Sequence, residues 1–154
     1  MRKAWRRAVN LRSFAAVMVA GLGLAAGAGR ADPALDYVLN CQGCHLPDGR
    51  GAPGRVPPLK DHVARFLALP EGRAFLIQVP GVARSALSDE RIAALMNWLV
   101  ARFDPEHLPA DFRPYTAGEV AALRANPRAQ VSARRAELLA RIAAIEGAAG
   151  DGRD

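Results

Sequence analysis

The sequence contains only two cysteines in its 154 residues, Cys41 and Cys44, and His45 directly follows the second. A disulfide between cysteines this close would close a very small loop and add little stability. A structural zinc site normally has four ligands, and this cluster offers three at most. A thioredoxin-like redox pair follows a strand, and the sequence shows no strand pattern. The scarcity of cysteine therefore argues against three common roles of a C-x-x-C pair.

Acidic residues are absent from the first 31 positions, where six basic residues lie. From Asp32 onward 15 basic and 15 acidic residues balance, although the whole chain has a formal net charge of +6 at pH 7. A domain that binds nucleic acid normally carries a basic patch, which this neutral remainder does not predict. The excess charge belongs to the N-terminal segment, and no nucleic-acid partner is expected.

The sequence also lacks a long hydrophobic run that would span a membrane. Residues 13–29 are uncharged and apolar, but the stretch is short and rich in Gly and Ala. A positive region precedes it and small residues follow, which is the layout of a secretory signal peptide. We predict a signal peptide over residues 1–31, cleaved after Ala31 or, as second choice, Ala28. The mature chain would be periplasmic without a membrane span, whereas an uncleaved leader would anchor it to the membrane.

The C-x-x-C-H pattern at residues 41–45 is typical of haem c attachment. Two thiols must add to the two vinyl groups on one side of the porphyrin, and residues at i and i+3 of a helical turn point the same way. His45 is then placed to supply the proximal imidazole of the iron. Its other ring nitrogen needs an acceptor, for which we predict a carbonyl of residues 56–59. The pattern thus predicts one covalent haem c on Cys41 and Cys44.

Three segments of the chain resemble the class I c-type cytochromes. DPALDYVLNCQGCHLPDGRGAPG, residues 32–54, is similar to their N-terminal helix, haem-binding turn and glycine-rich loop. VPPL, residues 56–59, resembles the proline segment that supports the proximal histidine, which implies that Pro58 lies beside the haem. LSDERIAALMNWLVARF, residues 87–103, resembles the C-terminal helix. The resemblance covers residues 32–103 and implies a small all-α cytochrome domain around one haem.

The spacing of apolar residues predicts the helices of this domain. Asp32 is a candidate N-cap of the first helix, on which Leu35, Val38 and Leu39 would form one apolar face. Ser88 is the candidate N-cap of the clearest helix. Its inner residues follow the i, i+3, i+4, i+7 spacing: Ile92, Leu95, Met96 and Leu99. Of these, Leu95 and Leu99 are predicted to contact the haem, and Trp98 is expected to pack on the first helix.

Residues 104–154 lie beyond the usual end of such a domain and predict a helical extension. TAGE at residues 116–119 has the pattern of a capping box that starts one helix. A second helix is expected over residues 131–147, followed by a frayed tail from Gly147. The extension either packs across the cytochrome domain, which is the interpretation we favour, or docks a partner protein.

The methionine that usually supplies the sixth iron ligand is missing from its expected place. In the family it commonly lies just before the C-terminal helix, where this sequence has VARSALSDE with Val82 at the matching position. Four explanations are open: an iron that is open or held by water or a backbone group, or ligation by His107, by Met96 or by His62. A methionine raises the reduction potential, a second histidine gives a lower one, and an open iron binds small ligands.

The resemblance implies a periplasmic monohaem cytochrome that carries single electrons and is not an enzyme. It also implies a dehydrogenase as electron donor and an oxidase or another cytochrome as acceptor. Two alternatives are a haem-based module that binds or senses a small ligand at an open iron, and a cytochrome subunit of a larger dehydrogenase complex. The sequence contains no catalytic triad, acid pair or phosphate-binding loop, so catalysis without the haem is not expected.

Overall fold

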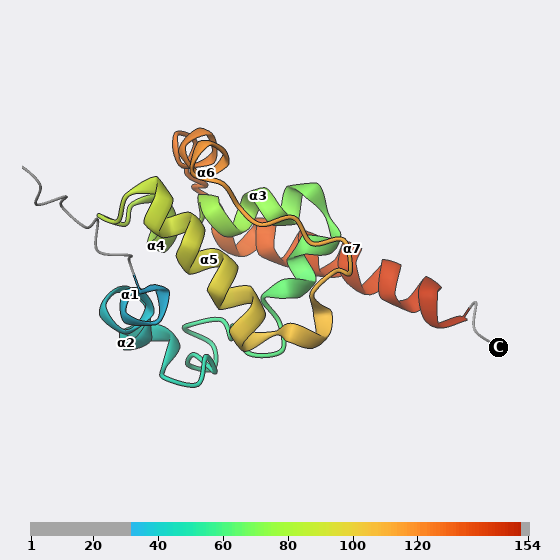
Figure 1. Cartoon of the computed structure of the whole chain (residues 1–154). Helices are drawn as coiled ribbons and strands as arrows, with labels where there is room; N and C mark the ends of the chain where they lie inside the picture. The colour runs from blue at the N-terminus through green and yellow to red at the C-terminus, as the bar shows by residue number, and fades with distance from the viewer. Residues whose placement is uncertain (1–31, 152–154) are drawn as a thin grey trace, which may run out of the picture. The chain divides into compact units, whose positions relative to one another are not determined.

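The computed structural model describes residues 32–151, which form helices joined by irregular segments (Figure 1). The predicted signal peptide and residues 152–154 lie outside the described residues. Within residues 32–151 there is no strand, only an isolated bridge between Ala52 and Val56, so the all-α prediction is confirmed. The elements are α1 (Pro33–Asn40), α2 (Gln42–His45), η2 (Ala64–Ala68), α3 (Pro70–Gln78), α4 (Pro80–Ala83), α5 (Asp89–Phe103), η3 (Pro105–His107), α6 (Ala117–Arg124) and α7 (Val131–Asp151).

Polar side chains start three of the helices, as the sequence predicted. Asp32, Ser88 and Thr116 each accept a hydrogen bond from a backbone N–H in the first turn of α1, α5 and α6, over 2.9, 3.4 and 3.2 Å. Glu119, the fourth residue of the TAGE segment, pairs its carboxylate with Arg73 of α3. The capping-box pattern therefore marked the helix start correctly, but its acidic residue joins α6 to another helix.

The apolar face predicted for α1 is exposed in the structure. Leu35, Val38 and Leu39 have exposed fractions of 52%, 49% and 68%, and the buried residues of this helix are Asp36 and Tyr37. The face that looked apolar in the sequence therefore points to solvent, and a polar pair of side chains points inward.

Contacts with α5 explain this orientation of α1. The carboxylate of Asp36 forms an ion pair with Arg91, whose Nε lies 3.2 Å from Asp36 Oδ2. The ring of Tyr37 packs against Trp98 and Phe103, with centroid distances of 5.7 and 4.9 Å. The predicted packing of Trp98 on the first helix is thus confirmed. Aromatic packing and a paired charge bury this face of α1 in preference to its leucines.

The helix α5 lies at the centre of the contacts among the elements. It packs against α1 and α6, while α3 packs against η2 and α6, and α7 packs against η2. The predicted inner residues of α5 are all buried: Ile92, Leu95, Met96 and Leu99.

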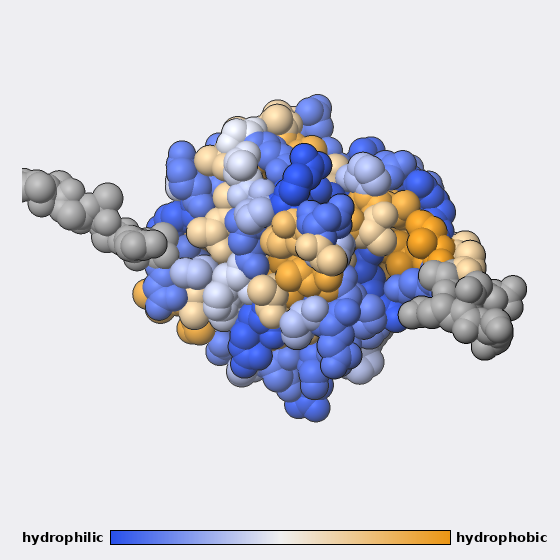
Figure 2. Space-filling view, turned by 45° about the vertical axis from the view of Figure 1, so that its right-hand side comes forward, coloured by the Kyte–Doolittle hydropathy of each residue, from blue (hydrophilic) through white to orange (hydrophobic). Residues whose placement is uncertain are grey.

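Hydrophobic residues also gather in the middle of the surface that Figure 2 shows, bordered by hydrophilic ones. Exposed apolar surface of this kind usually marks a binding site.

The C-terminal extension packs onto the helices that precede it. Contacts group the described residues 32–151 into one compact unit, and Leu138 and Ile142 of α7 are almost completely buried. The helix continues past Gly147 to Asp151, so the predicted frayed tail is helical up to that residue. No helix among the described residues is long and apolar enough to cross a membrane.

We expect Leu138→Ala to lower the free energy of unfolding by about 2–4 kcal/mol, because the truncation leaves a cavity in a packed core. Ile145 lies on the same helix with 47% of its surface exposed, so Ile145→Ala is the matched control and should cost less than about 1 kcal/mol. Denaturant unfolding of both variants measures the difference. Equal and small effects would show that α7 does not pack stably on the rest of the chain.

Candidate functional site

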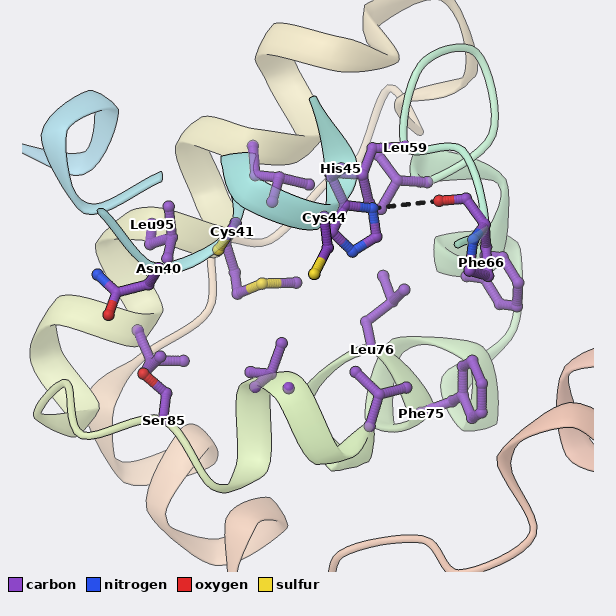
Figure 3. A pocket seen from close by; sticks show the side chains of 18 of the residues that line it. Asn40, Cys41, Cys44, His45, Leu59, Phe66, Phe75, Leu76, Ser85 and Leu95 are labelled. Carbon is purple, nitrogen blue, oxygen red and sulfur yellow. Dashed lines mark hydrogen bonds between the residues drawn. The ribbon is translucent and has the colours of Figure 1, made fainter. Parts of the chain in front are cut away.

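A cavity of about 370 Å³ lies among α2, α3, α4 and α5 (Figure 3). Most side chains that line it are apolar, and they come from segments that are far apart in the sequence. The structure brings to this cavity six residues that the sequence placed around a haem: Cys41, Cys44, His45, Pro58, Leu95 and Leu99. An apolar cavity with a few convergent polar groups is the usual form of a cofactor site.

The short helix α2 and its N-cap residue Cys41 hold the two cysteines and the histidine on one wall of the cavity. The backbone N–H groups of Cys44 and His45 both donate to the carbonyl of Cys41, over 3.1 and 2.9 Å. Both thiols are free, with Cys41 half-buried and Cys44 exposed. Burial raises the pKa of the Cys41 thiol, and the nearby Asp36 and Cys44 raise it further by smaller amounts. Two thiols one helical turn apart therefore face the edge of a single cavity.

The imidazole of His45 is held by the predicted proline segment. Its Nδ1 lies 3.1 Å from the carbonyl oxygen of Pro57, which can only accept, so Nδ1 carries the proton. The Nε2 atom then keeps its lone pair, as a metal ligand requires. Burial lowers the pKa of His45, and the hydrogen bond to Pro57 offsets part of this effect. The predicted acceptor within residues 56–59 is therefore confirmed as Pro57.

A glycine allows the loop after α2 to bring the Pro57 carbonyl back to His45. Gly51 has a φ of +65°, and a Cβ atom there would lie 2.4 Å from the carbonyl oxygen of Val56 and 2.8 Å from that of Pro57. Its N–H donates to the carbonyl of His45 over 3.0 Å. Only glycine combines this backbone conformation with so close an approach.

The extension adds a cationic side chain that the sequence analysis missed. Val131 and Arg135 of α7 also line the cavity. Arg135 is half-buried, with its guanidinium carbon 6.0 Å from the ring centroid of Phe66. Burial lowers its pKa, and no neighbouring carboxylate among the described residues offsets this. No sequence signal separates Arg135 from the other arginines of α7, because only the fold brings it to the cavity.

These groups match the chemical needs of haem c one by one. Two thiols can form thioethers, an imidazole with a free Nε2 can bind iron, and apolar walls can enclose the porphyrin. A half-buried guanidinium without a carboxylate partner in the described part of the chain suits the propionate groups. The residues present therefore fit a covalently bound haem.

Comparison with known proteins decides the family. The chain is 38% identical over 130 residues to a cytochrome c-552 of Thermus thermophilus, an alignment that spans 73% of this chain and 84% of the relative. The chain belongs to the class I c-type cytochromes. A second cytochrome c-552 from the same species is 39% identical over 114 residues, which cover 62% of this chain and 86% of the relative. No family model matches the cytochrome.

The cytochrome is accordingly a monohaem electron carrier with covalently bound haem c, and it is not an enzyme. Its cavity contains the groups that such a cofactor requires, and redox proteins are its partners. The cavity is lined by the residues that the sequence analysis placed on the proximal side of the haem, Cys41, Cys44, His45 and Pro58. The distal side is where this chain departs from the usual pattern.

The residues that α3 and α4 contribute to the cavity lining have no iron-binding side chain: Phe75, Leu76, Gly81 and Val82. Figure 3 shows Leu76 across the cavity from the imidazole of His45. Val79 and Val82 also line the cavity, from the end of α3 and from α4. Val82, at the position where the family resemblance predicts a methionine, therefore lies in the cavity wall.

Only one of the three candidate sixth ligands lines the cavity. Met96 does so from α5 and is 3% exposed. His62 is not among the lining residues, and its Nδ1 lies 2.8 Å from the carbonyl oxygen of Lys60. His107 is also outside the lining, with its Nδ1 2.5 Å from a carboxylate oxygen of Asp104. The two histidines are held elsewhere by their own hydrogen bonds.

We expect His62→Ala and His107→Gln to leave the visible spectra of the oxidised and reduced cytochrome unchanged, because neither imidazole lies in the cavity. His107→Gln should still lower the thermal midpoint, since the buried Asp104 loses the hydrogen bond from the imidazole. Absorption spectra and thermal unfolding of both variants test this. A change of spin state in either variant would mean that its histidine reaches the iron.

Proposed function

We propose that Cys41 and Cys44 hold the haem through two thioethers, that His45 is the proximal ligand, and that Arg135 pairs with a propionate. The observation that carries this proposal is the hydrogen bond from His45 to Pro57, which leaves Nε2 directed to bind metal within an apolar cavity. We also assign residues 32–103 to the cytochrome domain and residues 104–154 to the extension.

The bound haem supplies a one-electron iron couple, and the chain tunes and protects it. The Pro57 carbonyl strengthens the His45 donor and fixes the orientation of its ring. The apolar walls exclude water, which favours the less charged ferrous state and raises the reduction potential. Cys44 is exposed, so this edge of the cavity is open to a redox partner.

The partners we propose are a periplasmic dehydrogenase as donor and an oxidase or a second cytochrome as acceptor. The periplasmic location is supported by the signal-peptide layout of residues 1–31. Leu39 and Leu46 are exposed and lie close to Cys44 in the sequence, which suits a small and transient docking interface. Cell fractionation and co-purification with a dehydrogenase test the location and the donor.

We expect the matured protein to show a covalent haem spectrum that survives denaturation and acid–acetone extraction. Cys41→Ser and Cys44→Ser should each retain haem by one thioether and shift the reduced absorption bands, because one vinyl group remains unsaturated. The double variant should release its haem on extraction. Mass spectrometry and haem staining measure attachment. Haem that is extracted from the unsubstituted protein would overturn the proposed site.

A second candidate function, binding of a small ligand at the iron, is favoured by the apolar wall opposite His45. Leu76, Val79 and Val82 cannot bind iron, and Met96 lines the cavity beside Leu95 and Leu99 with a similarly small exposed fraction, as expected of a packing side chain. We propose that no side chain fills the sixth position and that Met96 is a packing residue.

We therefore expect the ferrous cytochrome to bind carbon monoxide, and Met96→Leu to leave the visible spectra unchanged. Leucine keeps the approximate volume of methionine, so the cavity is preserved while the thioether is lost. Leu99→Ile, at another cavity position of α5, is the control for side-chain shape alone, because it neither adds nor removes a possible iron ligand. A low-spin protein that carbon monoxide does not affect, and that becomes high-spin in Met96→Leu, would instead identify Met96 as the sixth ligand.

A further inference from the structure

Among the residues that the structure describes, Arg124, the last residue of α6, makes the most side-chain hydrogen bonds outside the haem site. Its Nε donates to the carbonyl of Ala83 over 3.2 Å, and its Nη2 donates to that of Ser85 over 2.5 Å. Its Nη1 donates to the carbonyl of Leu87 over 3.0 Å and to the carboxylate of Asp89 over 2.7 Å. One guanidinium thus binds three alternate carbonyls and the acidic first residue of α5.

The segment that Arg124 binds forms part of the cavity wall. Gly81, Val82 and Ser85 line the cavity, and Figure 3 shows Ser85 at its border. Leu87 is buried in the core with 7% exposure. Residues 84–88 connect α4 to α5 outside any helix. Residues 82–87, which we call the wall segment, therefore lie mostly outside regular secondary structure.

We propose that Arg124 is a positioning residue that holds the wall segment 82–87 closed over the haem. The proposal rests on the haem site described above, because it assigns residues 82–87 to the side of the cofactor opposite His45. Carbonyl groups that lose a buried donor must find another partner or turn toward water. The extension would therefore control how much water reaches the haem, and with it the reduction potential.

The guanidinium group is suited to this role in a way that an ammonium group is not. Its donors form a planar fork with fixed directions, so one side chain reaches carbonyls on several residues at once. The Arg124 side chain is 17% exposed, which places these bonds largely out of water. A lysine at this position would keep the charge beside Asp89 but would not bridge residues 83, 85 and 87.

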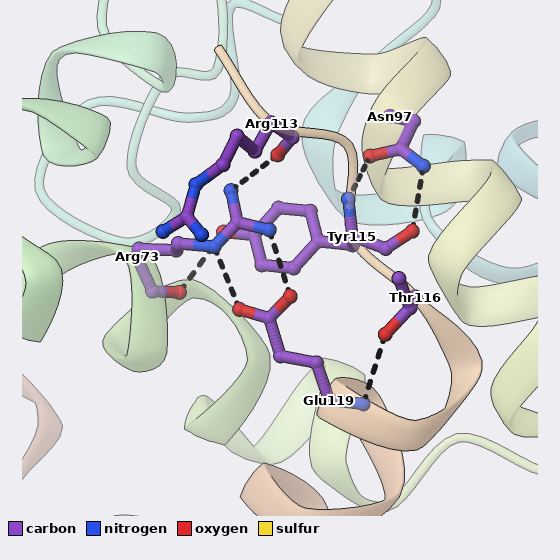
Figure 4. A network of polar contacts seen from close by, with 6 residues as sticks. All are labelled: Arg73, Asn97, Arg113, Tyr115, Thr116 and Glu119. Carbon is purple, nitrogen blue, oxygen red and sulfur yellow. Dashed lines mark hydrogen bonds and ion pairs between the residues drawn. The ribbon is translucent and has the colours of Figure 1, made fainter. Parts of the chain in front are cut away.

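A second arginine network, between Arg73 of α3 and the extension, provides the control for the effect of Arg124 (Figure 4). Arg73 of α3 binds both carboxylate oxygens of Glu119, over 2.6 and 2.8 Å, and the carbonyl of Arg113 over 2.7 Å. Its guanidinium carbon lies 3.9 Å from the ring centroid of Tyr115. This network also joins the extension to the earlier helices, but its hydrogen bonds go to residues other than 82–89.

The test is amide hydrogen exchange and reduction potential measured on the full haem-loaded protein with Arg124→Ala, Arg124→Lys or Arg73→Ala. In Arg124→Ala we expect exchange at Ser85 and Leu87 to accelerate about tenfold, because a charged group's hydrogen bonds are lost. The reduction potential should fall, because water reaches the cofactor. Arg124→Lys should restore neither property, while Arg73→Ala should leave both near those of the unsubstituted protein.

Each outcome bears on the proposal. Unchanged exchange at residues 82–87 in Arg124→Ala would overturn it, as would equal changes in Arg73→Ala, which would indicate only a loss of global stability. Full recovery in Arg124→Lys would show that charge alone suffices and would overturn the role of the fork. Should Arg124→Ala not fold, Arg124→Lys against Arg73→Ala decides the question. The visible spectrum of the unsubstituted protein tests the proposed function separately. A spectrum without covalent haem would refute that function, whatever the variants show.

Discussion

The hydrogen bond between the imidazole of His45 and the carbonyl of Pro57 is the interaction on which the haem site depends. It settles which ring nitrogen carries the proton and leaves the other one for the iron. It also requires the chain to turn back within twelve residues, which the glycine conformation at Gly51 and the bridge from Ala52 to Val56 make possible. The irregular loop after α2 is therefore a structural requirement of the proximal ligand.

Much of the fold was readable from the sequence because its signals are local. The N-caps Asp32 and Ser88, the inner face of α5 and the C-x-x-C-H turn each depend on residues within about one or two helical turns. The face of α1 that is buried could not be predicted in this way. Its orientation is set by Arg91 and the aromatic residues of α5, which lie more than fifty positions away. The apolar side chains of so short a helix do not outweigh those distant contacts.

The same distinction separates the two sides of the site. The proximal side comes from one continuous segment, so its spacing predicted the thiols, the imidazole and its acceptor. The distal side is assembled from α3, α4, α5 and α7, and sequence spacing left Met96, His62 and His107 as equal candidates. Only the fold argues against the two histidines as iron ligands, because the imidazole of His62 lies beside the carbonyl of Lys60 and that of His107 beside the carboxylate of Asp104. Arg135 carried no signal for the same reason, since α7 reaches the cavity through tertiary packing alone.

The missing methionine and the arginines of the extension become related once the cavity is considered as a whole. Where a methionine just before the C-terminal helix binds the iron, that bond also ties its own segment to the cofactor. A valine at position 82 forms no such bond, so residues 82–87 need another restraint. Arg124 supplies hydrogen bonds to three carbonyls of this segment, and Arg135 brings a cation to the same cavity from α7. The extension therefore belongs to the haem site in physical terms, although it begins after the C-terminal helix of the cytochrome domain.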